Sequence, residues 1–202
     1  MALSLVLLMI RMKLNQSFHL LFLVWNLFLA IIPFAITTLL FSIKKPKKLQ
    51  FLLLFLSWLL FLPNAPYIVT DLLHLQNSTR HLMWLDVLVI LSFATNGLIL
   101  YFLSLSDMET LLKQYLNPKT TKLLLIFIFG LTAFGIYLGR FLRYNSWEII
   151  NHPFNIVADV VMILFRPDIE AWIFTLTFAS FLAMLYGVLK TFTSQEISTM
   201  QQ

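Results

Sequence analysis

The segment Leu49–Leu75 reads LQFLLLFLSWLLFLPNAPYIVTDLLHL, and it combines a membrane-type apolar run with a proline-containing break and a polar ending. Proline lacks a backbone N–H and disfavours helical geometry in the residue before it, so carbonyls freed at Pro63 and Pro66 need partners from protein or water. We therefore expect the helix to break near the membrane surface. Asp71 and His74 follow the break three positions apart, which on a helix puts both side chains on one face, and they point to a polar site there.

The composition around this segment is that of an integral membrane protein. Hydrophobic residues make up 60% of the chain and charged residues 11%, with a mean hydropathy of +0.87. Soluble domains contain about 25% charged residues. The sequence therefore predicts an all-α fold, a polytopic transmembrane helix bundle that fills residues 1–202 as a single integral membrane domain.

The number of spans follows from the length of the apolar runs, because a helix needs about 20 mostly apolar residues to cross the hydrocarbon core. Residues 2–14 hold a shorter run interrupted by Arg11 and Lys13, so the prediction is five to six spans and the side of the amino terminus stays open. Residues 154–165 are too short to span and predict one short interfacial or re-entrant helix. The predicted spans are Phe18–Ile43, Leu49–Leu62, Leu82–Leu105, Leu123–Leu142 and Ala171–Leu189.

The lysines predict the orientation, because basic residues in short loops remain on the cytoplasmic side. The first long loop should lie on the cytoplasmic side of a cell membrane, because it carries Lys44, Lys45, Lys47 and Lys48. The C-terminus is then also cytoplasmic, and the segment around 67–81 lies outside. Tryptophans prefer the membrane interface. Those expected near the outer ends of the spans are Trp58, Trp84, Trp147 and Trp172.

Two compositional facts exclude whole classes of function. The chain has no cysteine, which excludes thiolate metal sites, redox pairs and cysteine nucleophiles. The net charge of +5 comes largely from lysines next to lipid, and no nucleic-acid motif accompanies it, so we predict contact with the lipid bilayer and no nucleic-acid partner.

Four outer residues have the chemistry of a divalent metal site: Asp71, His74, His81 and Asp86. Two imidazoles and two carboxylates could bind zinc or manganese and leave a position open for water. The same Asp71, His74 and Asp86 are candidate catalytic groups, as metal ligands or as acid and base. The alternative is structural, with Asp71 pairing with Arg80 and the histidines lying at the interface.

A second set of outer residues predicts binding of an anion. Arginine forms forked hydrogen bonds with phosphate or carboxylate groups, although interfacial arginines also serve as plain membrane anchors. Asp86 lies inside a span and should have a partner in the bundle, for which Arg80 and Arg140 are the candidates. The predicted binding residues are Asn64, Tyr67, Arg80, Arg140, Arg143 and Asp159.

Small residues in the fourth long span indicate close helix packing. Gly135 and Gly139 fit the small-x-x-x-small pattern, so helix–helix self-association through them is a further prediction.

Several phrases together carry a family resemblance: Trp25–Phe34 (WNLFLAIIPF), Leu62–Leu75 (LPNAPYIVTDLLHL) and Trp84-Leu85-Asp86. The chain resembles the bacterial multi-pass membrane proteins grouped as domain of unknown function family 1361. The resemblance implies location and fold, and no assigned reaction. It also marks Asn26, Pro33, Asn64, Pro66, Tyr67, Asp71, His74 and Asp86 as positions of interest.

Three functions are compatible with these patterns. The first is binding of a lipid headgroup or small anion in an outward-facing polar cavity, in a transport-accessory or binding role. The second is an intramembrane metal-dependent enzyme acting on a lipid-linked substrate. The third is a structural subunit of a membrane complex.

Overall fold

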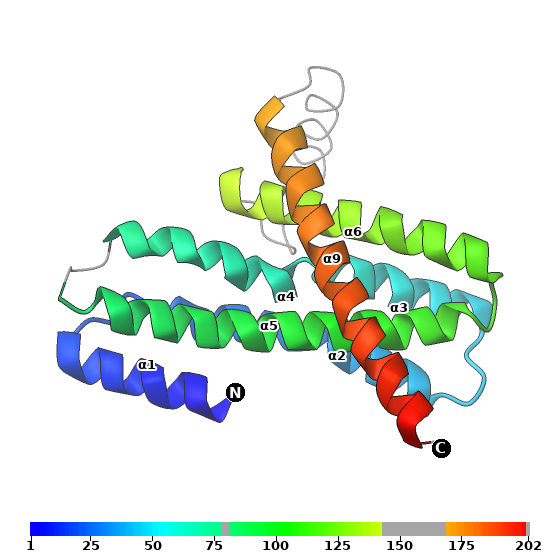
Figure 1. The fold of residues 1–202 in the computed structure, drawn as a ribbon, viewed down its shortest axis with the longest axis horizontal. Coiled ribbons are helices and arrows are strands. Elements are labelled where there is room, and N and C mark those ends of the chain that lie inside the picture. The colour runs from blue at the N-terminus through cyan, green and yellow to red at the C-terminus, as the bar shows by residue number, and fades with distance from the viewer. Residues whose placement is uncertain (78–80, 143–168, 201–202) are drawn as a thin grey trace. The chain divides into compact units, whose positions relative to one another are not determined.

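A computed structural model describes residues 1–77, 81–142 and 169–200, and this described part of the chain is helical without strands (Figure 1). This confirms the predicted all-α class. The predicted short helix at 154–165 lies outside the described residues. The helices are α1 (Ala2–Asn15), α2 (Phe22–Ser42), α3 (Lys48–Phe61), α4 (Asn64–Tyr67), the 3₁₀ helix η1 (Ile68–Asn77), α5 (Met83–Leu112), α6 (Pro118–Phe141) and α9 (Ile169–Met200).

Five helical stretches are long and apolar enough to cross a membrane, which confirms a multi-pass membrane protein. One of them, Lys48–Gln76, combines α3, α4 and η1, so the second span runs beyond the prolines. Helix α1 has 14 residues, fewer than the roughly 20 that a span requires. It is therefore an additional helix beside the five candidate spans.

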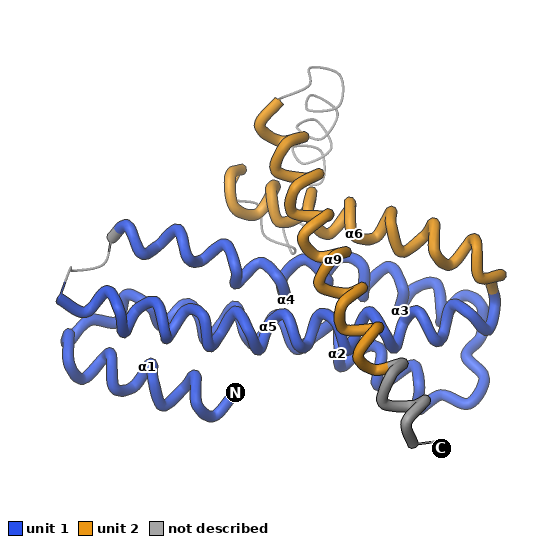
Figure 2. Tube along the Cα trace, in the orientation of Figure 1, with its two compact units in different colours: residues 1–115 blue, residues 116–202 orange. Residues whose placement is uncertain are grey.

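The chain forms two compact units, Met1–Tyr115 and Leu116–Gln202 (Figure 2). The first unit contains α1 to α5, and the second contains α6 and α9. The single membrane domain expected from the sequence stays a prediction.

Helix α5 is the central element of the first unit, where it contacts α1, α2, α4 and η1 (Figure 1). Its sequence explains this position, because apolar side chains such as Val89, Ile90 and Phe93 are fully buried. Small or polar residues interrupt them at Asp86 and Gly97, where neighbouring elements make specific contacts. The contacts at α5 thus position the polar residues of this unit.

The prolines change the type of helix without ending the helical path. Leu62, directly before Pro63, has φ −54° and ψ −41°, so the predicted departure from helical geometry is wrong at this residue. The reason is a change in hydrogen bonding: the Ala65 N–H bonds to the Leu62 carbonyl three residues back, and η1 then continues as a 3₁₀ helix.

The carbonyl of Phe61, which would normally accept a bond from Ala65, receives one from the side chain of Asn64. The Asn64 Nδ2 lies 2.9 Å from this oxygen. The carbonyl that Pro66 leaves without its usual N–H is that of Leu62, and it accepts the bond from Ala65, so the expectation that freed carbonyls would find partners is confirmed at Leu62.

The proline bend packs directly against α5 at Gly97. A methyl group at position 97 would clash with the backbone oxygen of Ala65 and would lie 3.1 Å from the Cδ1 of Ile68. Only the absence of a side chain allows this approach.

Trp58, one of the tryptophans predicted at the membrane interface, is instead buried in the protein. Trp58 is fully buried, and its indole N–H donates to the Ser104 hydroxyl at 2.7 Å, so the interfacial prediction is wrong for this residue. A buried indole needs a hydrogen-bond acceptor, and Ser104 of α5 provides it. Trp84 and Trp172 are exposed, and Trp147 lies outside the described residues.

In the second unit, α6 and α9 pack against each other through aromatic side chains. The rings of Tyr137 and Phe174 lie 5.9 Å apart, and those of Phe129 and Tyr186 lie 5.8 Å apart. Helix α6 begins at Asn117, whose side chain accepts a bond from the Thr120 N–H at 2.8 Å and caps the helix.

The glycines expected to mediate self-association, Gly135 and Gly139, are half-buried on α6. Their role in association stays a prediction.

Candidate functional site

The carboxylate of Asp86 is fully buried and forms an ion pair with Arg11 of α1. The Arg11 Nε donates to Oδ1 at 2.7 Å, and Nη2 approaches Oδ2 at 3.4 Å, so one guanidinium engages both carboxylate oxygens. Arg11 therefore has the role that the sequence suggested for Arg80 or Arg140. Because a charge inside a bundle is costly without a partner, this pair explains how both residues can be buried.

Arg11 also organises the loop between α1 and α2. Gln16 ends α1 in the left-handed conformation, with φ 45°, which turns the chain back toward α2. The Arg11 Nη1 then donates to the Ser17 carbonyl at 3.0 Å, and the His19 N–H donates to the Ser17 hydroxyl at 3.3 Å. The ion pair is thus connected through Ser17 to the backbone of His19.

A second polar contact holds α1 against α5. The Asn96 side chain donates to the Ser4 hydroxyl at 2.9 Å and accepts a bond from the Met1 amino group at 2.8 Å. Ser4, Leu8 and Arg11 are the buried residues of α1, spaced so that they share one face. Helix α1 therefore turns Ser4 and Arg11 toward protein and leaves Lys13 and apolar side chains such as Met9 exposed.

Asp71 of η1 is another buried carboxylate of this unit. It is 1% exposed, and its Oδ2 accepts a bond from the Asn26 side chain of α2 at 2.9 Å. The Nε2 of His74 lies 3.9 Å from its Oδ1. The spacing of Asp71 and His74 correctly indicated that the two side chains share a face.

The histidine ring of η1 meets a second histidine from the loop before α2. The rings of His19 and His74 lie 6.0 Å apart in an edge-on arrangement. Phe22 packs against both, with ring distances of 4.8 Å to His74 and 6.4 Å to His19. His19 is exposed and the side chain of His74 is about one-third exposed, so both imidazoles reach the surface.

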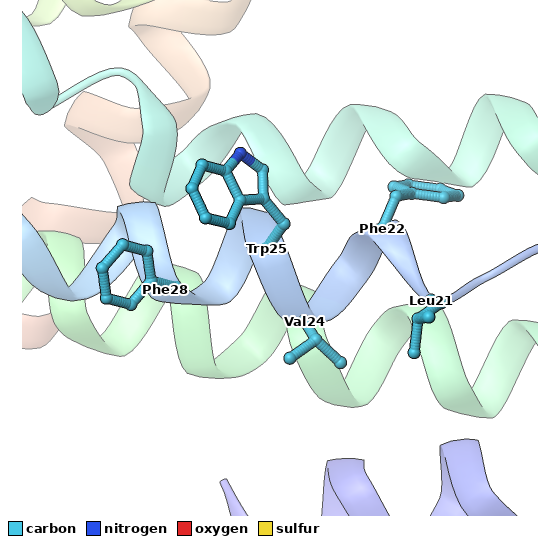
Figure 3. A pocket seen from close by; sticks show the side chains of 5 residues that line it. All are labelled: Leu21, Phe22, Val24, Trp25 and Phe28. Atoms are coloured by element: carbon cyan, nitrogen blue, oxygen red, sulfur yellow. The ribbon is translucent and has the colours of Figure 1, made fainter.

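An apolar pocket of about 650 Å³ adjoins this pair of histidines along α2. Figure 3 shows Phe22 and Trp25 on the side of α2 that faces η1. Phe22 also contacts His74, so the pocket begins beside the imidazoles. The lining residues are Leu21, Phe22, Val24, Trp25 and Phe28.

The structure does not bring the four predicted metal ligands together. Within residues 1–77, 81–142 and 169–200, no group of three or more His, Asp or Glu side chains could hold a metal ion. Asp86 is engaged with Arg11, whereas Asp71 and His74 are neighbours. His81 is exposed.

The predicted anion-binding residues fall into different parts of the chain. Asn64 bonds to the Phe61 carbonyl, and the backbone oxygen of Tyr67 accepts a bond from the Thr70 hydroxyl, so both contribute to the helix bend. Arg140 is half-buried near the end of α6, in the second unit. Arg80, Arg143 and Asp159 lie outside the described residues.

Sequence reasoning missed the roles of Arg11, His19 and Phe22. Arg11 carried a usable signal, because an ionisable residue within an apolar run needs a partner. His19 carried none: a lone histidine before an apolar helix has no pattern that points to another histidine 55 positions away. Tertiary structure alone brings these residues together.

Comparison with known proteins gives one match. Residues 25–185 match the family described as "Protein of unknown function (DUF1361)". No curated protein and no solved structure matches the chain. The matched segment covers most of the chain and includes Asn26, Asp71, His74 and Asp86, whereas Arg11 and His19 precede it.

Proposed function

The chain belongs to the DUF1361 family and is a multi-pass membrane protein, and we propose that it binds an anionic phosphate or carboxylate group at His19 and His74. The group is a lipid headgroup or a small free anion of the same chemistry. The protein would act in a binding or transport-accessory role at the outer face of a cell membrane, with the Lys44–Lys48 loop on the cytoplasmic side.

The pair of surface imidazoles is the observation that carries this proposal. A neutral imidazole donates one hydrogen bond and a protonated one donates two, so His19 and His74 together can engage the oxygens of one anion. Their rings come from different elements and lie 6.0 Å apart edge to face, so one anion bound beside the pair could accept hydrogen bonds from both.

The surroundings of the histidines support ligand binding over simple packing. Asp71 lies beside His74 and is itself held by Asn26, so His74 rests on a fixed polar support. The backbone N–H of His19 is bonded to Ser17, whose carbonyl accepts a bond from Arg11, so the backbone that carries this imidazole is fixed. When neighbouring residues already hold a binding group in place, binding a ligand costs less conformational entropy.

Histidine-selective NMR tests the proposal, because the chain has four histidines and therefore few signals. We would label the imidazoles of the full chain in nanodiscs of zwitterionic phosphatidylcholine and titrate with inorganic phosphate. The His19 and His74 signals should shift together and reach saturation, while sodium chloride at equal ionic strength should not reproduce this. His19→Gln and His74→Gln assign the two signals.

The variant His81→Gln is the matched control, since it should remove one signal and leave the saturable shift unchanged. Nanodiscs that contain phosphatidylglycerol distinguish the two sources of anion. A response to this lipid at much lower concentration than to phosphate assigns a headgroup, and the reverse assigns a free anion. The absence of a saturable shift with either probe would refute the proposal.

A further inference from the structure

The pocket on α2 has the features of a site for an apolar chain. Its lining is apolar, with the rings of Trp25 and Phe28 stacked 5.4 Å apart. Its volume is about 650 Å³, and its lining comes from the single stretch Leu21–Phe28, so it is an open depression along α2. Leu21, Trp25 and Phe28 are each about half exposed, so the pocket is open to the surroundings of the helix.

The position of the pocket places these surroundings inside the membrane. Phe22–Ser42 is a candidate span of 21 residues, and the pocket occupies its first two turns. From Leu21 to Phe28 the helix rises by about 10 Å. A chain in the pocket would therefore run from the end of the span toward the interior of the bilayer.

Phe22 joins this pocket to the histidines. It lines the pocket, and its ring lies 4.8 Å from His74 and 6.4 Å from His19. A molecule with a polar group at the imidazoles and a chain along α2 would contact both regions without crossing a polar barrier. This continuity of polar and apolar surfaces matches the two parts of an amphiphile.

We propose that the pocket of Leu21, Phe22, Val24, Trp25 and Phe28 holds the acyl chain of an anionic glycerophospholipid whose phosphate lies at His19 and His74. This inference rests on the proposed function and names its ligand as a lipid of the bilayer rather than a free anion. The two-part site selects by headgroup charge, while the aromatic walls hold one chain in place.

Quenching of Trp25 fluorescence by brominated acyl chains tests this inference. The full chain is placed in phosphatidylcholine nanodiscs that contain increasing fractions of brominated phosphatidylglycerol or, separately, brominated phosphatidylcholine. The signal of Trp25 is the difference between the wild type and Trp25→Phe. We expect saturation at a low fraction of the brominated anionic lipid and only a proportional rise with the neutral one.

Two further variants separate the pocket from the general lipid-facing surface. Val24→Phe fills the pocket and should abolish the saturable quenching. Leu39→Phe introduces the same ring at an exposed position on the same helix, outside the pocket, and should preserve it. Both substitutions lie on exposed positions, so they should leave folding unchanged, which size-exclusion chromatography checks.

The outcomes distinguish the two proposals. Equal, proportional quenching by both brominated lipids would show ordinary lipid contact and overturn the acyl-chain site. If the His19 and His74 signals still respond to phosphate in that case, the anion site stands alone. If neither signal saturates, the proposed function fails together with this inference.

Discussion

Asp86 and Asp71 are both almost fully buried, and each meets a different kind of partner. Asp86 forms an ion pair with the positively charged Arg11, and this pair connects two helices. Asp71 is matched by the amide of Asn26 and lies near His74, whose side chain remains partly exposed. At the scale of residues, Asp86 therefore joins α5 to α1, whereas Asp71 joins η1 to α2 and lies next to a histidine that is partly exposed.

Substituting Asp86 tests how much the protein is destabilised when Arg11 stays buried without a counter-charge. Asp86→Leu should destabilise the fold by about 3–5 kcal/mol, because Arg11 would remain buried without a counter-charge. The double variant Arg11→Met with Asp86→Leu should recover most of this loss. Unfolding in mixed micelles with increasing dodecyl sulfate measures both.

The same double variant also tests the link from Arg11 to His19. If Arg11 positions His19 through Ser17, the recovered protein should still lose the joint phosphate response of His19 and His74. A stable double variant with a full phosphate response would show that the ion pair serves stability alone.

Gly97 is a second residue whose role follows from one contact. Gly97→Ala should destabilise by about 1–3 kcal/mol, because the new methyl group clashes with the Ala65 carbonyl oxygen, a backbone atom that cannot rotate away. Gly130→Ala is the control, since nothing lies within 4 Å of a Cβ at that position. There alanine should be neutral or stabilising by up to about 1 kcal/mol. Equal effects at both positions would contradict this account.

Among the elements, the span that contains the prolines depends on contacts at each of its parts. Trp58 at the end of α3 donates to Ser104, the bend packs on Gly97, and η1 carries Asp71 and His74. Helix α1 adds a face of buried polar residues against α5. Hydrogen bonds at a few positions therefore fix how these elements align along α5, an alignment that apolar packing alone would not define.

A double-mutant cycle measures one such bond. Trp58→Phe and Ser104→Ala should each destabilise the protein, and their coupling energy should be about 0.6–1.7 kcal/mol, the range for hydrogen bonds between membrane helices. The cycle is read from unfolding curves of the two single variants, the double variant and the wild type. A coupling energy of zero would mean that the indole is held by packing alone.

For the whole molecule, the orientation in the membrane decides whether the histidine site meets the outer or the inner solution. The absence of cysteine in the chain makes this measurable with single introduced thiols. In intact cells, a membrane-impermeant maleimide should label Ser78→Cys and should label Lys45→Cys only after permeabilisation. The expected result follows from the cluster of lysines around residue 45. The opposite pattern would place the proposed anion site on the cytoplasmic side.

The sequence by itself determined the class of the protein and most of its spans. Apolar runs of about 20 residues must be helical in lipid, since only internal hydrogen bonds satisfy the backbone there, and this constraint is local. The same reasoning located Asp71 and His74 on one face, because helical spacing is also local. Family resemblance was confirmed over residues 25–185.

Tertiary structure alone decided which polar residues meet. Arg11 and Asp86 are 75 positions apart, and Asn26 and Asp71 are 45 positions apart, so no local pattern connects them. The proline bend likewise packs on a distant residue, Gly97, which leaves room for the Ala65 carbonyl oxygen. Helical periodicity acts over neighbouring turns, whereas the pairing of buried charges and the fit of a bend depend on how whole helices pack.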